Sequence, residues 1–386
     1  MHVGIFLHKL LSKVTHKKRI ITLILLVEAV LVFKQLSVTR LGRALALRIQ
    51  ERSCIKRADR LIGNEKLHSE RKNIYHAAIK LLVSSKISPR IIVDWSAIPN
   101  SKFYNLRAAL AAKGRALTLY EEVHPEKKLG NRKIQNKFLH TLRELLPRNC
   151  KPIIVTDAGF TNSWFKAVLN IGYDFIGRIR NNGTYYTEQM QGWSKIENLC
   201  KSYNGGEKSF GKVILCKVNS LGCYLYITKE KSKKRFKSKQ ELKKGDRSVR
   251  NHRKSAKEAL VIVSSLHGSG VCKKVISIYQ KRMQIEEAFR DLKSSRYGFG
   301  FEQSYSRKIA RIEIMLLVAM LASMIAWLVG LAMEKMKLHY QFQVNSIKFK
   351  RVLSLFFLGC QAIKRKIKIP IKMLEKSALE ACYDSN

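Results

Sequence analysis

Short apolar runs alternate with amphipathic stretches along the middle of the chain. The runs rich in β-branched and aromatic residues predict strands at 91–98 (IIVDWSAI), 116–123 (ALTLYEEV), 153–156 (IIVT) and 173–180 (YDFIGRIR). Residues 131–147 and 162–172 have helical spacing instead, and these two predicted helices end at Pro147 and Gly172. Strands that alternate with helices in this way are typical of an α/β domain.

The pattern changes on both sides of this region. Residues 1–85 combine apolar residues at helical spacing with Arg and Lys on the opposite face, and the last hundred residues are again helical and basic. The N-terminal pattern suits a helix-turn-helix that reads the DNA major groove, and it equally suits plain helical packing with a solvated basic face. Both interpretations stay open.

Residues 177–276 contain Gly-rich turns and further predicted strands, which include 211–219, 222–230 and 260–266. Within this region, the run at 228–257 holds 14 Lys or Arg against 3 Asp or Glu. Such a run is too polar to pack into a core, so we expect a loop.

Two apolar segments could suggest a membrane protein. The first, at 20–33, is short and interrupted by Glu28, so we expect a buried helix. The second, at 312–333, is long enough to span a bilayer and has only Glu313 as a charge. Because it directly follows the helix with the richest candidate chemistry, we expect it to be a central core helix and expect no membrane association.

The charge of the chain indicates its partner. Its 74 Lys and Arg exceed its 28 Asp and Glu, which gives a net charge of +46, while 46% of its residues are hydrophobic. This combination predicts a folded protein that binds a polyanion or a membrane surface. The eight cysteines form no CxxC pair, so we expect no zinc site and reduced thiols in a cytosolic setting.

The most informative stretch is YQKRMQIEEAFRDLK, residues 279–293. On one continuous helical wheel, Tyr279, Arg282, Glu286 and Lys293 would share an arc of about 60°, beside an apolar stripe that faces the core. Glu287 and Asp291 would point elsewhere and be solvated. An ordinary surface helix with charge pairs is the alternative interpretation.

Two aspartates stand at the ends of the most strand-like runs, Asp94 and Asp157. Active sites of α/β sheets lie at strand ends, and a third carboxylate from Glu286 would complete the minimum set for two Mg²⁺ ions. Two such ions beside phosphate are the ingredients of phosphodiester cleavage. Each aspartate taken alone would more often be a turn residue.

The spacing Y-x2-R-x3-E-x6-K resembles the signature of the cut-and-paste DDE transposases in the fourth-numbered family of bacterial insertion sequences. The blocks VDWSAI, TLYEE, IIVTDAGF and YGFG also resemble that family, and TRLGRAL and IKRADRLIGNEKLHSERK resemble its subgroup typified by the tetracycline-resistance transposon. The resemblance covers nearly the whole chain.

This resemblance implies a ribonuclease-H-like core with a β-rich insertion before the last catalytic helix. It implies that Asp94, Asp157 and Glu286 are catalytic ligands of two Mg²⁺ ions, for which Mn²⁺ would substitute. It also implies that Tyr279, Arg282 and Lys293 bind phosphates of the transposon end. The reaction would be double-strand cutting through a DNA hairpin, followed by attack of the 3′-hydroxyl on target DNA.

The resemblance also predicts the organisation of the chain and its partners. We expect a DNA-end-binding helical region at 1–85, the first part of the core at 86–176, the insertion at 177–276, the final core helices at 277–335 and a basic helical region for dimerisation or DNA contact at 336–386. The expected partners are double-stranded DNA and a second copy in a paired-end complex. The expected location is the bacterial cytoplasm, at the nucleoid.

One departure from the family pattern concerns the hairpin. Relatives place a Trp in the last insertion strand, where it stacks on a base flipped out of the hairpin, and the matching residue here is Leu260. Leucine has no π face for such a contact. The alternatives to a transposase are a metal-dependent nuclease without strand transfer, an inactive DNA-binding relic and a membrane protein.

Overall fold

The computed structural model describes residues 3–45, 47–83, 88–180, 182–229, 259–344, 346–347 and 349–381. The chain divides into two compact units, unit 1 with residues 1–152 and 283–386, and unit 2 with residues 153–282. Nearly all of the basic run predicted as a loop, 230–257, lies outside the described residues. The five domain boundaries predicted from the sequence stay predictions.

Unit 1 contains an antiparallel sheet in the order β3-β2-β1. Its strands are β1 (Arg90–Ala97), β2 (Phe103–Ala112) and β3 (Arg115–Pro125), which confirms the strands predicted at 91–98 and 116–123. The tight turn between β2 and β3 places Gly114 at φ +69°, a conformation that glycine adopts without steric cost. Register pairs Asp94 with Arg107 and Arg107 with Glu121, so one row of charged residues crosses the sheet.

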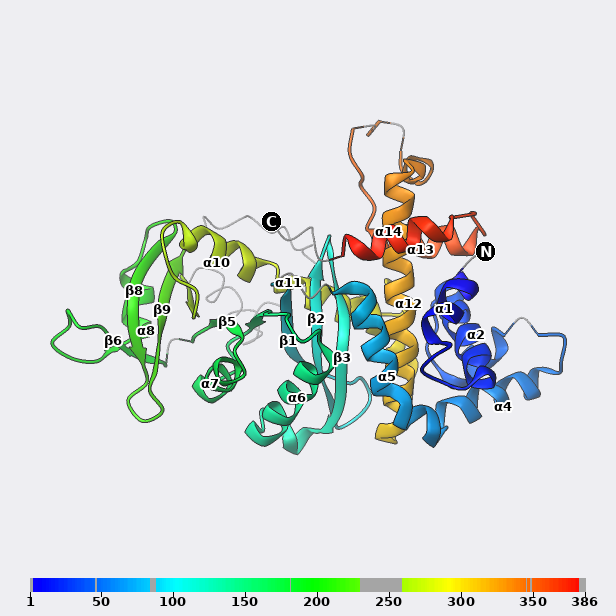
Figure 1. The fold of residues 1–386 in the computed structure, drawn as a ribbon, viewed down its shortest axis with the longest axis horizontal. Coiled ribbons are helices and arrows are strands. Elements are labelled where there is room, and N and C mark those ends of the chain that lie inside the picture. Colours follow the sequence, from blue (N-terminus) through cyan, green and yellow to red (C-terminus); the bar gives the residue numbers. More distant parts are fainter. Residues whose placement is uncertain are drawn as a thin grey trace, which may run out of the picture. The chain divides into compact units, whose positions relative to one another are not determined.

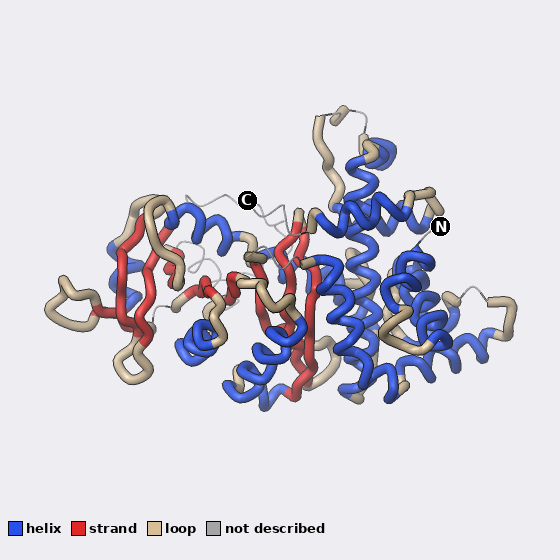
Figure 2. The backbone as a smooth tube through the Cα atoms, in the orientation of Figure 1, coloured by secondary structure: helices blue, strands red, loops and turns tan. Residues whose placement is uncertain are grey.

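Helices make up the rest of unit 1, and Figure 2 shows them in blue beside the strands. They are α1 (Val3–Leu11), α2 (Lys17–Phe33), α3 (Val38–Arg43), α4 (Glu51–Ile62), α5 (Glu65–Leu82), α6 (Arg132–Leu145), α11 (Met283–Lys293), α12 (Ile309–Lys335), α13 (Leu355–Lys364) and α14 (Ile371–Leu379). Short 3₁₀ turns are η1 (Glu126–Lys128), η3 (Phe301–Gln303) and η4 (Leu338–Phe342). The helices predicted at 20–33 and 131–147 are confirmed.

The long apolar helix α12 is the centre of unit 1 (Figure 1). It contacts α2, α5, α13, α14 and β3, and 94% of its most apolar window is buried. Among the described residues it is the one helix long and apolar enough to cross a membrane, and its burial inside unit 1 supports the core-helix interpretation. Within its first turns, Glu313 is buried and accepts hydrogen bonds from Arg71 on α5 and from the Val123 amide on β3. A buried carboxylate with these donors is stabilised rather than isolated.

Two glycines allow α12 and α13 to pack closely. A Cβ atom at Gly330 would lie 1.9 Å from the Leu355 carbonyl oxygen, and one at Gly359 would lie 1.8 Å from the Ala326 carbonyl oxygen. Both distances are far below contact, so any side chain at either position would force the two helices apart. The close crossing therefore depends on glycine in both helices.

Unit 2 contains a sheet in the order β4-β5-β10-β9-β8-β6-β7. The strands are β4 (Ile153–Thr156), β5 (Asp174–Arg178), β6 (Thr184–Tyr186), β7 (Ser194–Lys195), β8 (Lys208–Leu215), β9 (Leu221–Thr228) and β10 (Leu260–Ser264), and the helices are α7 (Asn162–Asn170), α8 (Ile196–Ser202) and α10 (Val271–Gln280). Strands β4 and β5 are parallel, while β5, β10, β9 and β8 pair antiparallel. Phe165 of α7 stacks on Phe175 of β5 and closes the crossover between the parallel strands.

Candidate active site

The first part of the candidate site lies in unit 1, on β1. Asp94 is half-buried and follows the fully buried residue Val93. Its carboxylate oxygen Oδ1 accepts a hydrogen bond of 2.8 Å from the Trp95 amide, which fixes the side chain against the strand. Asp94 lies inside β1, three residues before its end at Ala97, so the strand-end position predicted for this residue is wrong; burial nevertheless decreases from Asp94 onwards.

Helix α11 brings Glu286 to the same unit. The helix packs on β1, β2 and β3 through the buried side chains of Ile285, Phe289 and Leu292. Glu286 lies in its first turn, where the positive end of the helix dipole favours a carboxylate, and its side chain is exposed. The apolar stripe predicted for this segment is therefore confirmed, and it orients Glu286 away from the core.

Lys293 ties the end of α11 to the strand that carries Asp94. Its Nζ donates a hydrogen bond of 2.7 Å to the Ser96 hydroxyl and lies 5.3 Å from the centre of the Phe289 ring. Burial lowers the pKa of Lys293 to about 8; the charge of Arg107 lowers it further and Asp94 opposes both effects. Lys293 is therefore a cation close to Asp94 whose charge titrates near neutral pH.

Arg107 was not predicted as part of the site, although it stands beside Asp94. Its guanidinium lies 4.6 Å from the centre of the Phe289 ring and forms an ion pair of 2.7 Å with the buried Glu121. Arg107 thus connects β2, β3 and the apolar face of α11. A lone arginine inside the apolar run LRAALAA was the signal that could have found it, because an unpaired arginine is almost never buried.

The second part of the candidate site lies in unit 2. Asp157 directly follows β4 and accepts a hydrogen bond of 2.8 Å from the Gly159 amide, which closes a turn after the strand. Because β4 and β5 are parallel, with Thr156 in register with Gly177, Asp157 and Arg178 lie at the same edge of that sheet. The predicted strand-end position of Asp157 is confirmed.

Tyr279 and Arg282 belong to this second part. Tyr279 is buried near the end of α10, which packs on β5, β9 and β10. Burial raises the pKa of its phenol, the nearby charges of Arg282 and Arg178 lower it, and Asp157 raises it. Asp157, Tyr279 and the two arginines therefore form one electrostatic cluster within unit 2.

The single helix predicted for 279–293 is wrong. Helix α10 ends at Gln280, a turn follows at Lys281 and Arg282, and α11 begins at Met283. One helical wheel therefore cannot relate Tyr279 to Glu286, and the two residues belong to different units. The wheel holds only within α11, where it correctly places Ile285, Phe289 and Leu292 on one buried face.

Glu287 and Asp291 are not both solvated, contrary to the sequence prediction. Both accept hydrogen bonds of 2.7 Å from the Arg115 guanidinium at the start of β3, and Asp291 is only 6% exposed. Burial raises the pKa of Asp291 while Arg115 opposes that shift. Glu287 and Asp291 therefore hold α11 on the sheet, whereas Glu286 is exposed.

The donor set fits a divalent magnesium ion, because carboxylate oxygens are its preferred protein ligands. Among the described residues, no three His, Cys, Asp or Glu side chains come together in a group that could hold a metal ion. Asp94 and Glu286 belong to unit 1, and Asp157 belongs to unit 2.

The fold and these residues define an α/β protein with acidic side chains within a strand, directly after a strand and on a helix, accompanied by cations. Residues 87–325, more than half of the chain, match the family described as the transposase DDE domain, and the chain belongs to this family. No curated protein matches the chain. Members of this family act on DNA and generally use divalent metal ions, which indicates enzymatic cleavage and transposition of DNA.

Proposed function

We propose that this protein is a cut-and-paste DNA transposase whose catalytic carboxylates are Asp94, Asp157 and Glu286, in a ribonuclease-H-like core. The family match and the positions of the three acids support the proposal. The observation that carries it is the hydrogen bond from Lys293 to Ser96, since it fixes the helix with Glu286 against the strand with Asp94. Such a fixed relation is what a shared metal site needs.

Asp94, Asp157 and Glu286 would hold two Mg²⁺ ions, with Mn²⁺ as a substitute. Ions at such a site supply activation of a water or 3′-hydroxyl and stabilisation of the leaving oxygen. The protein's own cations act on the DNA. Lys293, Arg282 and Tyr279 would bind phosphates beside the cut, because ammonium, guanidinium and phenol groups all donate hydrogen bonds to phosphate oxygens.

The finer steps follow the family resemblance. The enzyme would bind the terminal repeats of its insertion sequence as a homodimer, cut both strands through a DNA hairpin and join the 3′-hydroxyl ends to target DNA. The net charge of +46 suits a protein that contacts transposon ends and target together. It would work at the bacterial nucleoid, in the cytoplasm.

The test combines the purified protein, DNA with its own flanking repeats, Mg²⁺ and a target plasmid. We expect nicked, hairpin and joined products with the wild type. Asp94→Asn, Asp157→Asn and Glu286→Gln should each abolish cleavage and leave binding to the end DNA nearly intact, because each removes a metal ligand and no phosphate contact. Cleavage without joining when pre-cut ends are supplied would indicate a nuclease, and binding without cleavage would indicate a relic.

A further inference from the structure

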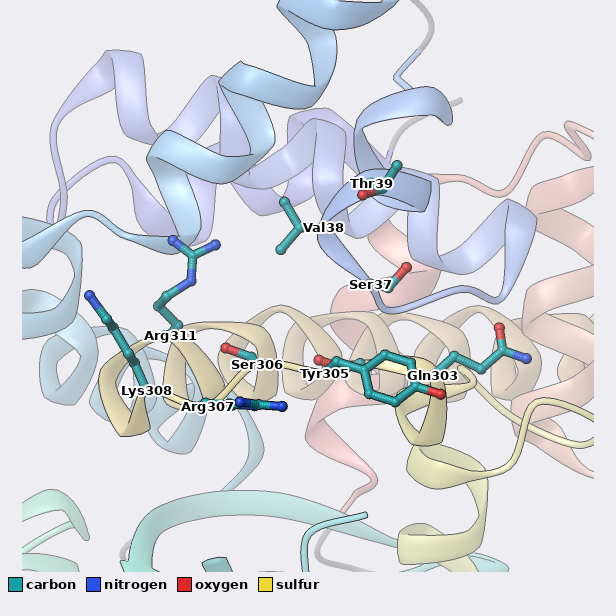
Figure 3. Close-up of a pocket in the computed structure, with 10 residues that line it drawn as sticks. Ser37, Val38, Thr39, Gln303, Tyr305, Ser306, Arg307, Lys308 and Arg311 are labelled. Carbon is teal, nitrogen blue, oxygen red and sulfur yellow. The ribbon is translucent and has the colours of Figure 1, made fainter. Parts of the chain in front are cut away.

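A hollow of about 510 Å³ in unit 1 lies outside the candidate active site. Figure 3 shows its two sides, formed by residues 37–39 and by residues 303–308 with Arg311. Val38 is the only aliphatic residue in this lining; the others are hydroxyl, amide, phenol or cationic side chains. Pockets for apolar ligands are lined mainly by hydrophobic groups, so this lining favours a polar ligand.

The charge of the lining is positive. Arg307 and Lys308 are exposed, and neither forms an ion pair with any residue that the structure describes. The nearest acid in sequence, Glu302, instead accepts hydrogen bonds from the amide and hydroxyl of Ser295. Arg311 pairs with Asp59, whose side chain is 54% exposed, so solvent weakens the neutralisation of this third cation. The hollow therefore favours an anion.

The start of α12 adds to this positive potential. The helix begins at Ile309, has no acidic residue in its first turn and has no side-chain hydrogen bond at its N-cap, Lys308. Its first amide groups therefore carry the partial positive charge of a 27-residue helix without a carboxylate to offset it. Beside it, Tyr305 is 77% exposed and offers a flat aromatic surface.

A second hollow, of about 460 Å³, connects this surface with the turn between β1 and β2. It is lined by residues 100–103 and by Arg307, which borders both hollows. Asn100 also donates a hydrogen bond of 2.6 Å to the Glu302 carbonyl oxygen, which holds the two linings together. Asn100 follows Asp94 by six residues, a separation of at most about 20 Å along an extended chain.

We propose that the two hollows form one groove, the Arg307 groove, which binds the phosphate backbone of duplex DNA within about one helical turn of the cut. Arg307 and Lys308 contact phosphates, and the hydroxyls of Ser37 and Thr39 add hydrogen bonds. This proposal rests on the proposed function, because the groove would bind the transposon-end DNA where it extends away from the candidate active site at Asp94. It adds a contact surface separate from Tyr279, Arg282 and Lys293.

The test measures how the DNA affinity of the full chain depends on salt. Each phosphate contact contributes about 0.9 to the slope of log K against log salt. Arg307→Ala/Lys308→Ala should therefore reduce the slope by about 1.8, and the charge-preserving Arg307→Lys/Lys308→Arg should restore most of it. The matched control is Lys133→Ala/Lys137→Ala on α6, which removes two exposed charges outside the regions expected to contact DNA.

A second measurement locates the contact. Neutral methylphosphonates placed one at a time along the end DNA should weaken wild-type binding at positions within about one turn, roughly 10 base pairs, of the cut. In Arg307→Ala/Lys308→Ala, methylphosphonates at those same positions should no longer weaken DNA binding. Equal slopes for this variant and the α6 control, or unchanged position effects, would overturn the proposal. Wild-type protein that neither binds nor cuts its own end DNA would instead refute the proposed function.

Discussion

Arg107 and Glu121 form an ion pair of 2.7 Å in which both side chains are almost completely buried, at 4% and 1% exposed. Asn105 donates a further hydrogen bond to the same carboxylate oxygen, Glu121 Oε2. The pair holds Arg107 under the Phe289 ring and beside Asp94, so the position of the candidate site depends on a polar contact inside the sheet.

Removal of Arg107 should therefore destabilise the protein strongly. Arg107→Ala leaves the Glu121 carboxylate buried without its cation, which should cost about 3–5 kcal/mol of unfolding free energy. The double variant Arg107→Met/Glu121→Gln removes both charges and should recover much of that loss. Denaturant unfolding measures both effects. The control, Arg43→Ala, breaks an ion pair in which both side chains are about 60% exposed, so it should cost under about 1 kcal/mol. A loss for Arg107→Ala as small as that for Arg43→Ala would contradict the prediction.

Lys293 should make stability depend on pH in a defined window. Its pKa in the folded protein is about 8, below the ordinary value of 10.5, so between these values the unfolded chain binds more protons and stability rises with pH. Lys293→Met removes this dependence. The stability advantage of Lys293→Met over the wild type should thus be largest below pH 8 and shrink as pH rises towards 10.5. Unfolding of the metal-free proteins at several pH values measures this difference.

Lys293→Arg provides the control for that measurement. Its guanidinium keeps the charge throughout the window, so its stability relative to Lys293→Met should stay constant across the same pH range. If the difference in unfolding free energy between the wild type and Lys293→Met does not change with pH, the prediction is contradicted. The Lys293 ammonium would then not be desolvated, although its burial between α11 and the sheet implies that it is.

The acids that follow Glu286 along α11 should affect stability rather than chemistry. Asp291→Ala removes a buried partner of Arg115 and should cost about 2–3 kcal/mol, whereas Glu287→Ala removes a half-exposed partner and should cost under about 1 kcal/mol. Glu287→Ala should keep its cleavage activity, in contrast to Glu286→Gln. Parallel unfolding and cleavage assays check this distinction. An essential Glu287 together with a dispensable Glu286 would mean that the catalytic glutamate has been assigned wrongly.

Much of the fold could be predicted because its strands and helices are locally distinct. The strand β4 is a four-residue β-branched run, and α12 is apolar on all sides, so periodicity and composition identify both. The short strands β6 and β7 and the helix α8 were not predicted. They have only two to seven residues each, and their pairing partners, rather than their own pattern, determine their conformation.

The site was predicted less completely, because its supporting contacts are distant in sequence. The position of Asp157 directly after β4 could be recognised locally, whereas Asp94 lies inside β1 and not at its end. The pairing of Arg115 with Asp291 joins residues far apart in the chain, and a helical wheel contains no information about such a partner. The break at Lys281 and Arg282 has no Gly or Pro to mark it. Tertiary packing, not local propensity, separates α10 from α11.

Leu260 provides a test of the hairpin steps. It is the first residue of β10, pairs with Thr228 of β9 and is half-buried, so a larger ring can extend into solvent without displacing the core. If this position corresponds to the base-stacking Trp of relatives, Leu260→Trp should accelerate hairpin formation and resolution. A stacking gain of about 1–3 kcal/mol at the bent transition state corresponds to a rate increase of about 5-fold to 150-fold.

First-strand nicking provides the internal control for this variant, because it precedes base extrusion and depends on the three carboxylates. Its rate should be the same in the wild type and in Leu260→Trp. A time course of nicked, hairpin and resolved products separates the steps. Equal rates after nicking would mean that no base is flipped here, or that another side chain already receives it. Met283, which is 45% exposed at the start of α11, is the nearest such candidate in sequence to Glu286, and Met283→Ala should then slow the hairpin steps alone.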